Sequence, residues 1–239
     1  MRDSGRKWLR LPLGLLLVGI VFAGGGAISQ AVSRIISNDL AMKGWLSTTI
    51  FQLSMGFIAV VIMLILGRGR LKGFGFSRGT HFPLFKVLLL VLVVEVLVSV
   101  VFIPFPTPGE SHFATDFSFW QIVVGIWIVA STMEEVVDRG LFQSFLAPLA
   151  GCRLSLPRVT LSLPVIAGAI VFSASHIPLL MMGIDPTLGT QILVSTFALG
   201  LIAGYFREAT GSLLPAIVAH SFANMVGMGT MALFEALGL

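Results

Sequence analysis

Two adjacent glutamates, Glu134 and Glu135, end an uncharged apolar stretch that runs from residue 117 to residue 133. Near the centre of a bilayer a carboxylate costs roughly 2.5–3.5 kcal/mol even on lenient insertion scales. An adjacent pair therefore needs a cationic partner, a proton or a water-filled cavity. Because such groups are rare in lipid unless they have a role there, the pair predicts a functional site inside the membrane.

Two of the four histidines, His176 and His220, also fall inside apolar segments. Phe172 and His176 share a helical face, as do His220 and Asn224, because residues four apart lie one turn above each other. Since each polar group would be costly facing lipid, we expect these side chains to converge with the two glutamates. A carboxylate beside a neutral imidazole can deprotonate water, and histidine and asparagine can donate hydrogen bonds to an oxyanion. These are the parts needed for amide hydrolysis.

Three motifs in this order resemble the CPBP family. They are Glu-Glu-x-x-x-Arg at 134–139, Phe-x-x-x-His at 172–176 and His-x-x-x-Asn at 220–224. The family groups CAAX prenyl proteases with bacteriocin-processing and bacteriocin-immunity (Abi) membrane proteins. The resemblance covers about residues 118–232, which would be the catalytic core of a single membrane domain spanning residues 1–239.

The resemblance implies an intramembrane endopeptidase. Glu134 would activate water together with His176, and His220 and Asn224 would form the oxyanion site. The implied substrate is a membrane-associated peptide or a prenylated protein, cleaved in a CAAX-type or peptide-processing reaction.

Glu135, Arg139 and Phe172 would be supporting residues in this resemblance. Glu135 followed by Arg139 at i+4 is also the favourable orientation for a helical ion pair, which leaves Glu134 free for water. Glu95 lies inside another apolar segment and outside all three motifs. It could pair with a buried cation, line the substrate cavity or remain protonated, and we expect a structural or cavity-lining role.

The sequence favours a reaction without a metal cofactor. One histidine and Asn224 serve better as oxyanion donors, and no further carboxylate is evident to orient zinc-bound imidazoles. In the alternative, a metallo-type enzyme, Glu134, His176 and His220 would bind zinc and leave a fourth position open. The His-Glu-x-x-His motif of zinc proteases and the Gly-x-Ser-Gly motif of rhomboids are absent from the sequence.

Two other classes of function remain open. The first is an inactive immunity or scaffold protein that keeps the family fold and binds a peptide or partner. The second is a proton-coupled transporter, because membrane-embedded Glu, His and Asn also build proton relays. The inverted repeat that is typical of transporters is not found in this sequence.

The elements that must position these residues are membrane-spanning helices. Of 239 residues, 56% are hydrophobic and only 11% are charged, which excludes a soluble globular domain. The apolar runs are continuous rather than alternating, so they predict an all-α, polytopic bundle of about seven to eight helices and not a β-barrel. The predicted spans are 11–30, 45–67, 83–105, 118–137 with an extension towards 149, 160–180, 187–206 and 212–234.

Charge predicts the topology. Basic residues gather before the first span, after the second and around 139–158, whereas Glu110 and Asp116 lie between the third and fourth spans. The positive-inside rule then predicts a multi-pass cell-membrane protein with a cytoplasmic amino terminus, and the basic clusters indicate no nucleic-acid partner. We interpret the first span as retained rather than as a cleaved signal. Residues 105–108 or 138–149 could add a re-entrant piece, and the solitary Cys152 is expected to be packed.

Overall fold

The computed structural model describes residues 7–35, 40–79, 82–105, 117–181 and 183–237. Within these ranges seven helices are long and apolar enough to cross a membrane, which confirms the predicted polytopic helical bundle. Each begins and ends within a few residues of its predicted span, apart from the extended fourth one. The seven are Arg10–Ser33, Gly44–Leu66, Leu84–Phe102, Phe119–Gln143, Leu163–Met181, Pro186–Thr210 and Leu214–Phe234.

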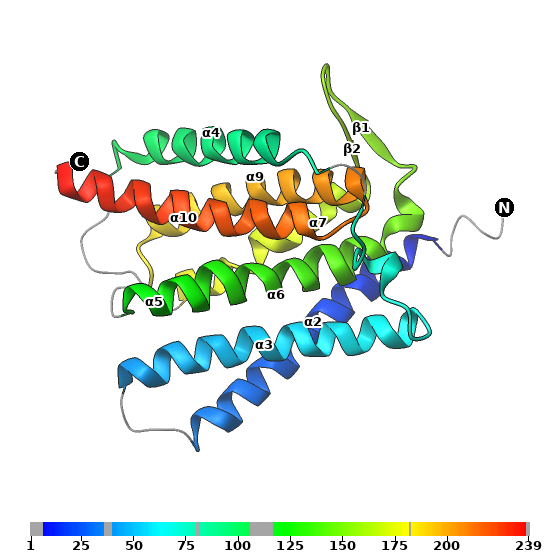
Figure 1. Ribbon diagram of the computed structural model, residues 1–239, viewed down its shortest axis with the longest axis horizontal. Helices are drawn as coiled ribbons and strands as arrows, with labels where there is room; N and C mark the ends of the chain where they lie inside the picture. Colours follow the sequence, from blue (N-terminus) through cyan, green and yellow to red (C-terminus); the bar gives the residue numbers. More distant parts are fainter. Residues whose placement is uncertain (1–6, 36–39, 80–81, 106–116, 182, 238–239) are drawn as a thin grey trace.

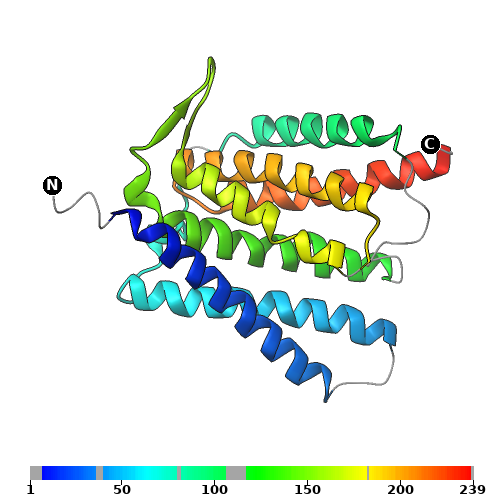
Figure 2. The same cartoon turned by 180° about the vertical axis from the view of Figure 1, so that it is seen from behind.

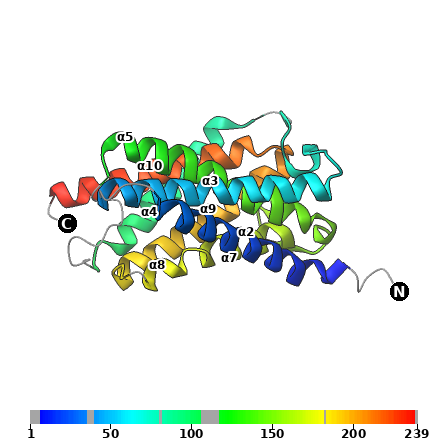
Figure 3. The same cartoon turned by 90° about the horizontal axis from the view of Figure 1, so that it is seen from below.

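The helices lie roughly parallel to one another in a bundle. Figure 1 shows α4, α10, α6 and α3 side by side, with α2 crossing α3 obliquely. Seen from behind, α7 and α9 pack against each other across the other face (Figure 2). From below, the start of α2 and the end of α10 lie at opposite ends of the bundle (Figure 3). The helices are α2 (Arg10–Ser33), α3 (Leu40–Leu66), α4 (Leu84–Phe102), α5 (Phe119–Gln121), α6 (Ser131–Glu135), α7 (Leu163–Ala174), α8 (Ile177–Met181), α9 (Pro186–Thr210) and α10 (Leu214–Leu237).

The fourth span is one long helix with an unusual hydrogen-bonding pattern. Residues Ile122–Ala130 and Val136–Gln143 are π-helical, and they flank the single α-helical turn α6 that carries the glutamate pair. π-Helical turns are rare and are found frequently at functional sites. The span continues to Gln143, which agrees with the predicted extension.

Short segments around the fourth span differ from the all-helical prediction. A 3₁₀ turn at Ala147–Leu149 leads into a two-stranded antiparallel hairpin, β1 (Arg153–Ser155) and β2 (Thr160–Ser162). A second 3₁₀ turn lies at Lys72–Phe74. The hairpin leaves the bundle at the end where α2 begins (Figure 1). Three-residue strands carry too few residues for periodicity to reveal them, so the hydropathy pattern could not indicate the hairpin.

One local prediction was wrong and others lie beyond the described ranges. Cys152 precedes the hairpin and is exposed, not packed, because this segment projects from the bundle. Glu110, Asp116 and the proline-containing stretch 106–108 fall in residues that the structure does not describe. The cytoplasmic location of the amino terminus therefore stays a prediction.

Capping residues fix where the site-bearing helices begin and end. Ser162 caps α7, with its Oγ accepting from the Val165 amide, and Pro164 lies in the first turn. Asp185 caps α9 by accepting from the amides of Thr187 and Leu188. Gly211 ends α9 at φ 72°, a left-handed conformation that glycine adopts at low cost.

Small residues set how closely α7 and α9 approach. A Cβ added at Gly200 would lie 2.7 Å from the Ala169 Cα, so no larger residue fits there. A Cβ at Gly204 would lie 3.2 Å from a Val165 methyl group. Small residues thus let these two membrane helices pack tightly. The close approach brings the Gly200 carbonyl within hydrogen-bond reach of Arg139.

Candidate active site

Glu135 is the centre of a fully buried ionic cluster. Its Oε1 lies 3.1 Å from Arg139 Nη1, one turn along the same helix, and 2.9 Å from His220 Nδ1 on α10. Both Glu135 and Arg139 have no exposed side-chain surface. A carboxylate oxygen only accepts hydrogen bonds, so His220 Nδ1 carries the proton and donates it to Glu135. The predicted ion pair is confirmed, and it also anchors one of the motif histidines.

Arg139 joins the fourth span to α7 and α9. Its Nη2 donates to the Gly200 carbonyl at 3.3 Å, and its guanidinium lies 4.5 Å from the centre of the Phe172 ring. That ring also meets His176 and His220 edge-on, with centroids 5.2 and 5.1 Å away. Phe172 is thus the common contact of Arg139 and both motif histidines.

Glu134 differs from its neighbour because its side chain is 17% exposed. One oxygen, Oε1, accepts a hydrogen bond from Gln52 Nε2 on α3 at 2.7 Å. The other, Oε2, lies 3.7 Å from His220 Nε2. One carboxylate oxygen is therefore held by a hydrogen bond, whereas the second faces His220 and the side chain remains part-exposed.

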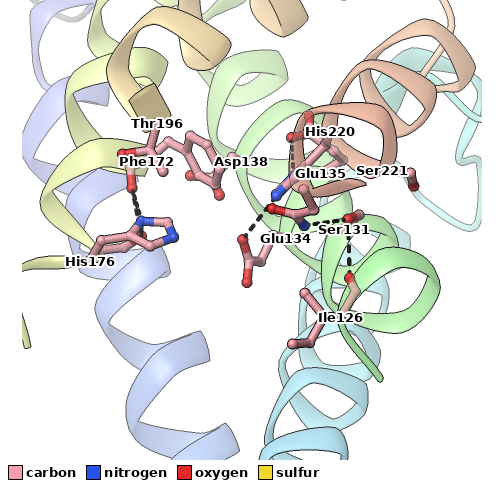
Figure 4. Close-up of polar contacts among 12 residues, drawn as sticks. Ile126, Ser131, Glu134, Glu135, Asp138, Phe172, His176, Thr196, His220 and Ser221 are labelled. Atoms are coloured by element: carbon pink, nitrogen blue, oxygen red, sulfur yellow. Dashed lines mark hydrogen bonds and ion pairs between the residues drawn. The ribbon is translucent and has the colours of Figure 1, made fainter. Parts of the chain in front are cut away.

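His176 lies in the turn between α7 and α8. Its Nδ1 is 2.9 Å from the Phe172 carbonyl, which can only accept, so the proton lies on Nδ1 and Nε2 is free to act as a base. Among the described residues, His176 makes no hydrogen bond or ion pair with Glu134, His220 or Asn224. Figure 4 shows Glu134 pointing toward His176 across the site.

Both histidine rings contact Phe172 although they lie at different distances from the starts of α7 and α10. His176 comes about 20 Å and His220 about 9 Å from the start of α7 and α10, at 1.5 Å per residue. The helices run in the same direction, so α7 must begin further out than α10 for both rings to contact Phe172. The offset comes from the position of α7, which begins directly after the hairpin.

Asn224 lies one turn beyond His220 and faces the fourth span. Its Nδ2 donates to Ser131 Oγ at 3.0 Å, and Ser131 in turn donates to the Ile126 carbonyl at 3.2 Å (Figure 4). An amide nitrogen carries two hydrogens, so this contact fixes the side chain and leaves one donor for a ligand. The structure thus places Asn224 against α6, the helical turn that carries Glu134.

The motifs left out three residues that touch this cluster. Gln52 binds Glu134, Ser131 binds Asn224, and Asp138 is a buried third carboxylate 4.0 Å from Arg139 Nη1. Asp138 could have been found from its spacing, because it is four residues after Glu134 on the same helix. Gln52 is a polar residue in a largely apolar span, but the sequence does not indicate which residue it contacts.

Glu95 lies apart from the cluster. Its two oxygens are 2.9 and 2.7 Å from Ser195 Oγ on α9, and the side chain is buried. One turn on, Ser99 Oγ is 3.1 Å from Thr230 Oγ1 on α10. Both contacts join α4 to its neighbours, which supports the structural alternative for Glu95.

The alternative zinc ligands are not gathered around one point. Among the described residues, no group of three or more His, Cys, Asp and Glu side chains is placed to hold a metal ion. Glu134 and His220 are close, but the Nδ1 of His176 is turned to the carbonyl of Phe172. The reaction without a metal cofactor therefore stays a prediction.

The fold and the site together define a multi-pass helical membrane protein with an ionisable cluster inside its bundle. Residues 116–226 match the family described as Type II CAAX prenyl endopeptidase Rce1-like. This segment, a little under half of the chain, is similar to the Rce1-like family, in agreement with the three motifs. The similarity supports a CAAX-type intramembrane protease. Comparisons with curated proteins and with solved structures gave no significant match.

Proposed function

We propose that the protein is an intramembrane endopeptidase in which Glu134 activates the water that attacks a peptide carbonyl. The single observation that carries this proposal is that the two oxygens of the Glu134 carboxylate have different surroundings. Oε1 is held by Gln52, whereas Oε2 faces His220 at 3.7 Å, and the side chain is part-exposed. A general base needs one such oxygen within reach of water.

In this mechanism Glu134 takes a proton from water as the water oxygen bonds to the carbonyl carbon. His176 assists through its free Nε2, since its Nδ1 proton is occupied by the Phe172 carbonyl. When the tetrahedral intermediate collapses, the carbon–nitrogen bond breaks and the leaving amine receives the proton. The products are a new carboxylate and a free amine, and water is the only co-reactant.

The developing oxyanion would be met by His220 Nε2 and by the second Nδ2 hydrogen of Asn224. Because Nδ1 of His220 already donates to Glu135, Nε2 can donate only if the ring carries both protons. The charge of Glu135, at 2.9 Å, stabilises that imidazolium. Glu135 would therefore act through His220 and not on the substrate.

The proposed substrate is a prenylated protein or another membrane-associated peptide, and the proposed reaction uses no metal. Arg139 and Phe172 keep the histidines in place, and neither supplies a proton to the reaction. The bundle interior suits a substrate whose lipid group remains in the bilayer, because the glutamate pair lies within a predicted span.

The test is cleavage by purified protein reconstituted in liposomes, with a farnesylated peptide that ends in a CAAX sequence. Mass spectrometry should detect release of the last three residues by wild type and not by Glu134→Ala. Proteomics of membranes that carry the two forms would find other substrates as lost terminal fragments. Near-normal cleavage by Glu134→Ala would refute the proposal, and loss with a tight chelator that zinc restores would overturn the metal-free mechanism.

A further inference from the structure

Gln52 lies outside the segment that matches the family and yet holds the proposed water-activating residue. It belongs to α3, and its Nε2 donates to Glu134 Oε1 at 2.7 Å across 82 positions in the chain. The side chain is buried, with 7% of its surface exposed. A buried amide in an apolar helix is costly unless it is paired, and Glu134 is the partner of its donor group.

The packing of α3 places Gln52 at this point. Gly56, one turn further along the same face, meets Met133, the residue before Glu134. A Cβ at Gly56 would lie 2.1 Å from the Met133 Sδ atom, so a larger residue would have to displace the Met133 side chain. Gln52 and Gly56 thus share the face that packs against α6.

The same face carries another contact with the fourth span. Trp45, two turns before Gln52, donates through Nε1 to the Gln121 carbonyl at 3.0 Å. This hydrogen bond ties α3 to the fourth span without touching the glutamate pair. It therefore offers a matched control for the effect of helix packing alone.

We propose that Gln52 is a positioning residue that fixes the orientation of the Glu134 carboxylate for the hydrolytic reaction. Its hydrogen bond occupies Oε1 and thereby directs Oε2 toward His220. Without it the carboxylate could rotate about its side-chain bonds, and fewer molecules would hold the reactive geometry. A misplacement of about 1 Å in a reacting group can reduce a rate by about 10²-fold.

This inference rests on the proposed function, because it assigns a role relative to Glu134. The first variant is Gln52→Met, which keeps the length and apolar packing of the side chain but has no donor. The second is Gln52→Asn, which keeps the amide on a chain one methylene shorter. Trp45→Phe is the packing control, and Glu134→Gln tests the proposed function itself.

Steady-state cleavage in liposomes should show that Gln52→Met lowers kcat by about 10- to 100-fold. KM should stay within about threefold, because Gln52 touches Glu134 and not the substrate. Gln52→Asn should also lower kcat, whereas Trp45→Phe should keep it near the wild-type value. Thermal unfolding in detergent should give similar midpoints for Gln52→Met and Trp45→Phe.

Wild-type kcat in both Gln52 variants would overturn the positioning role, and so would an equal fall in kcat for Trp45→Phe. A change in KM without a change in kcat would also contradict the positioning role. These outcomes differ from failure of the proposed function, which would appear as normal cleavage by Glu134→Gln. If Glu134→Gln is inactive while both Gln52 variants are normal, only the positioning role fails.

Discussion

Two regions of the bundle bury a carboxylate, and they do so in different ways. On the fourth span, Glu134 and Glu135 meet an arginine, a histidine and an amide that come from three helices. On α4, Glu95 meets a serine hydroxyl from α9 with both of its oxygens. Both regions lie within helices that are apolar enough to cross a membrane.

The difference is in what the second carboxylate oxygen does. Both Glu95 oxygens face the same hydroxyl, so that group is satisfied by a contact that joins two helices. Glu134 has one oxygen held by Gln52 and one that faces His220, and its side chain is part-exposed. An intramembrane carboxylate is therefore not sufficient evidence for catalysis. A part-exposed carboxylate with one oxygen that faces a histidine is the more specific sign.

The largest expected effect follows from removing the reactive carboxylate. Glu134→Gln should lower kcat for the CAAX peptide by about 10⁴-fold, the upper end of what a general base contributes. The amide keeps the shape and still accepts from Gln52, so the thermal unfolding midpoint should change little. If this variant keeps more than one tenth of wild-type cleavage, Glu134 is no longer distinguished from Glu95 by a catalytic role.

Arg139→Met tests the buried ionic cluster. It leaves Glu135 and Asp138 buried without their cation, and breaking a buried pair in this way typically costs about 3–5 kcal/mol of folding stability. Thermal unfolding in detergent should show a clearly lower midpoint. Val137→Ala, a nearby buried change that leaves the charges intact, serves as the control and should be milder.

Asn224→Ala removes one proposed oxyanion donor. Loss of one such donor typically costs about 10²–10³ in rate, so kcat should fall by that factor in a folded protein. Ser131→Ala removes only the group that orients Asn224 and should have a smaller effect on kcat. If both variants cleave at the wild-type rate, Asn224 is structural and the oxyanion site lies elsewhere.

Glu95→Gln should have the smallest effect. The amide carbonyl still accepts from Ser195, and the net contribution of one hydrogen bond is about 1 kcal/mol. We expect kcat within threefold of wild type in the liposome assay. A fall in kcat as large as that of Glu134→Gln would show that Glu95 takes part in the reaction and is not only structural.

The sequence was sufficient for the class of fold and for the local pairs within the candidate site. Continuous apolar runs predicted the spans because the requirement for about 20 apolar residues is local to each segment. Spacing of four predicted that Glu135 pairs with Arg139 and that Phe172 and His176 share a face, and the two rings do meet edge-on. The three motifs together predicted the similarity to the family.

Tertiary structure alone decided which groups meet across helices. His220 reaches Glu135 across 85 positions and Gln52 reaches Glu134 across 82, and no local period encodes either contact. These contacts depend on close approach at particular glycines, such as Gly56 against Met133. The sequence therefore determined which residues are costly in lipid, whereas packing of the helices decided how Glu134 and Glu135 came to have different partners.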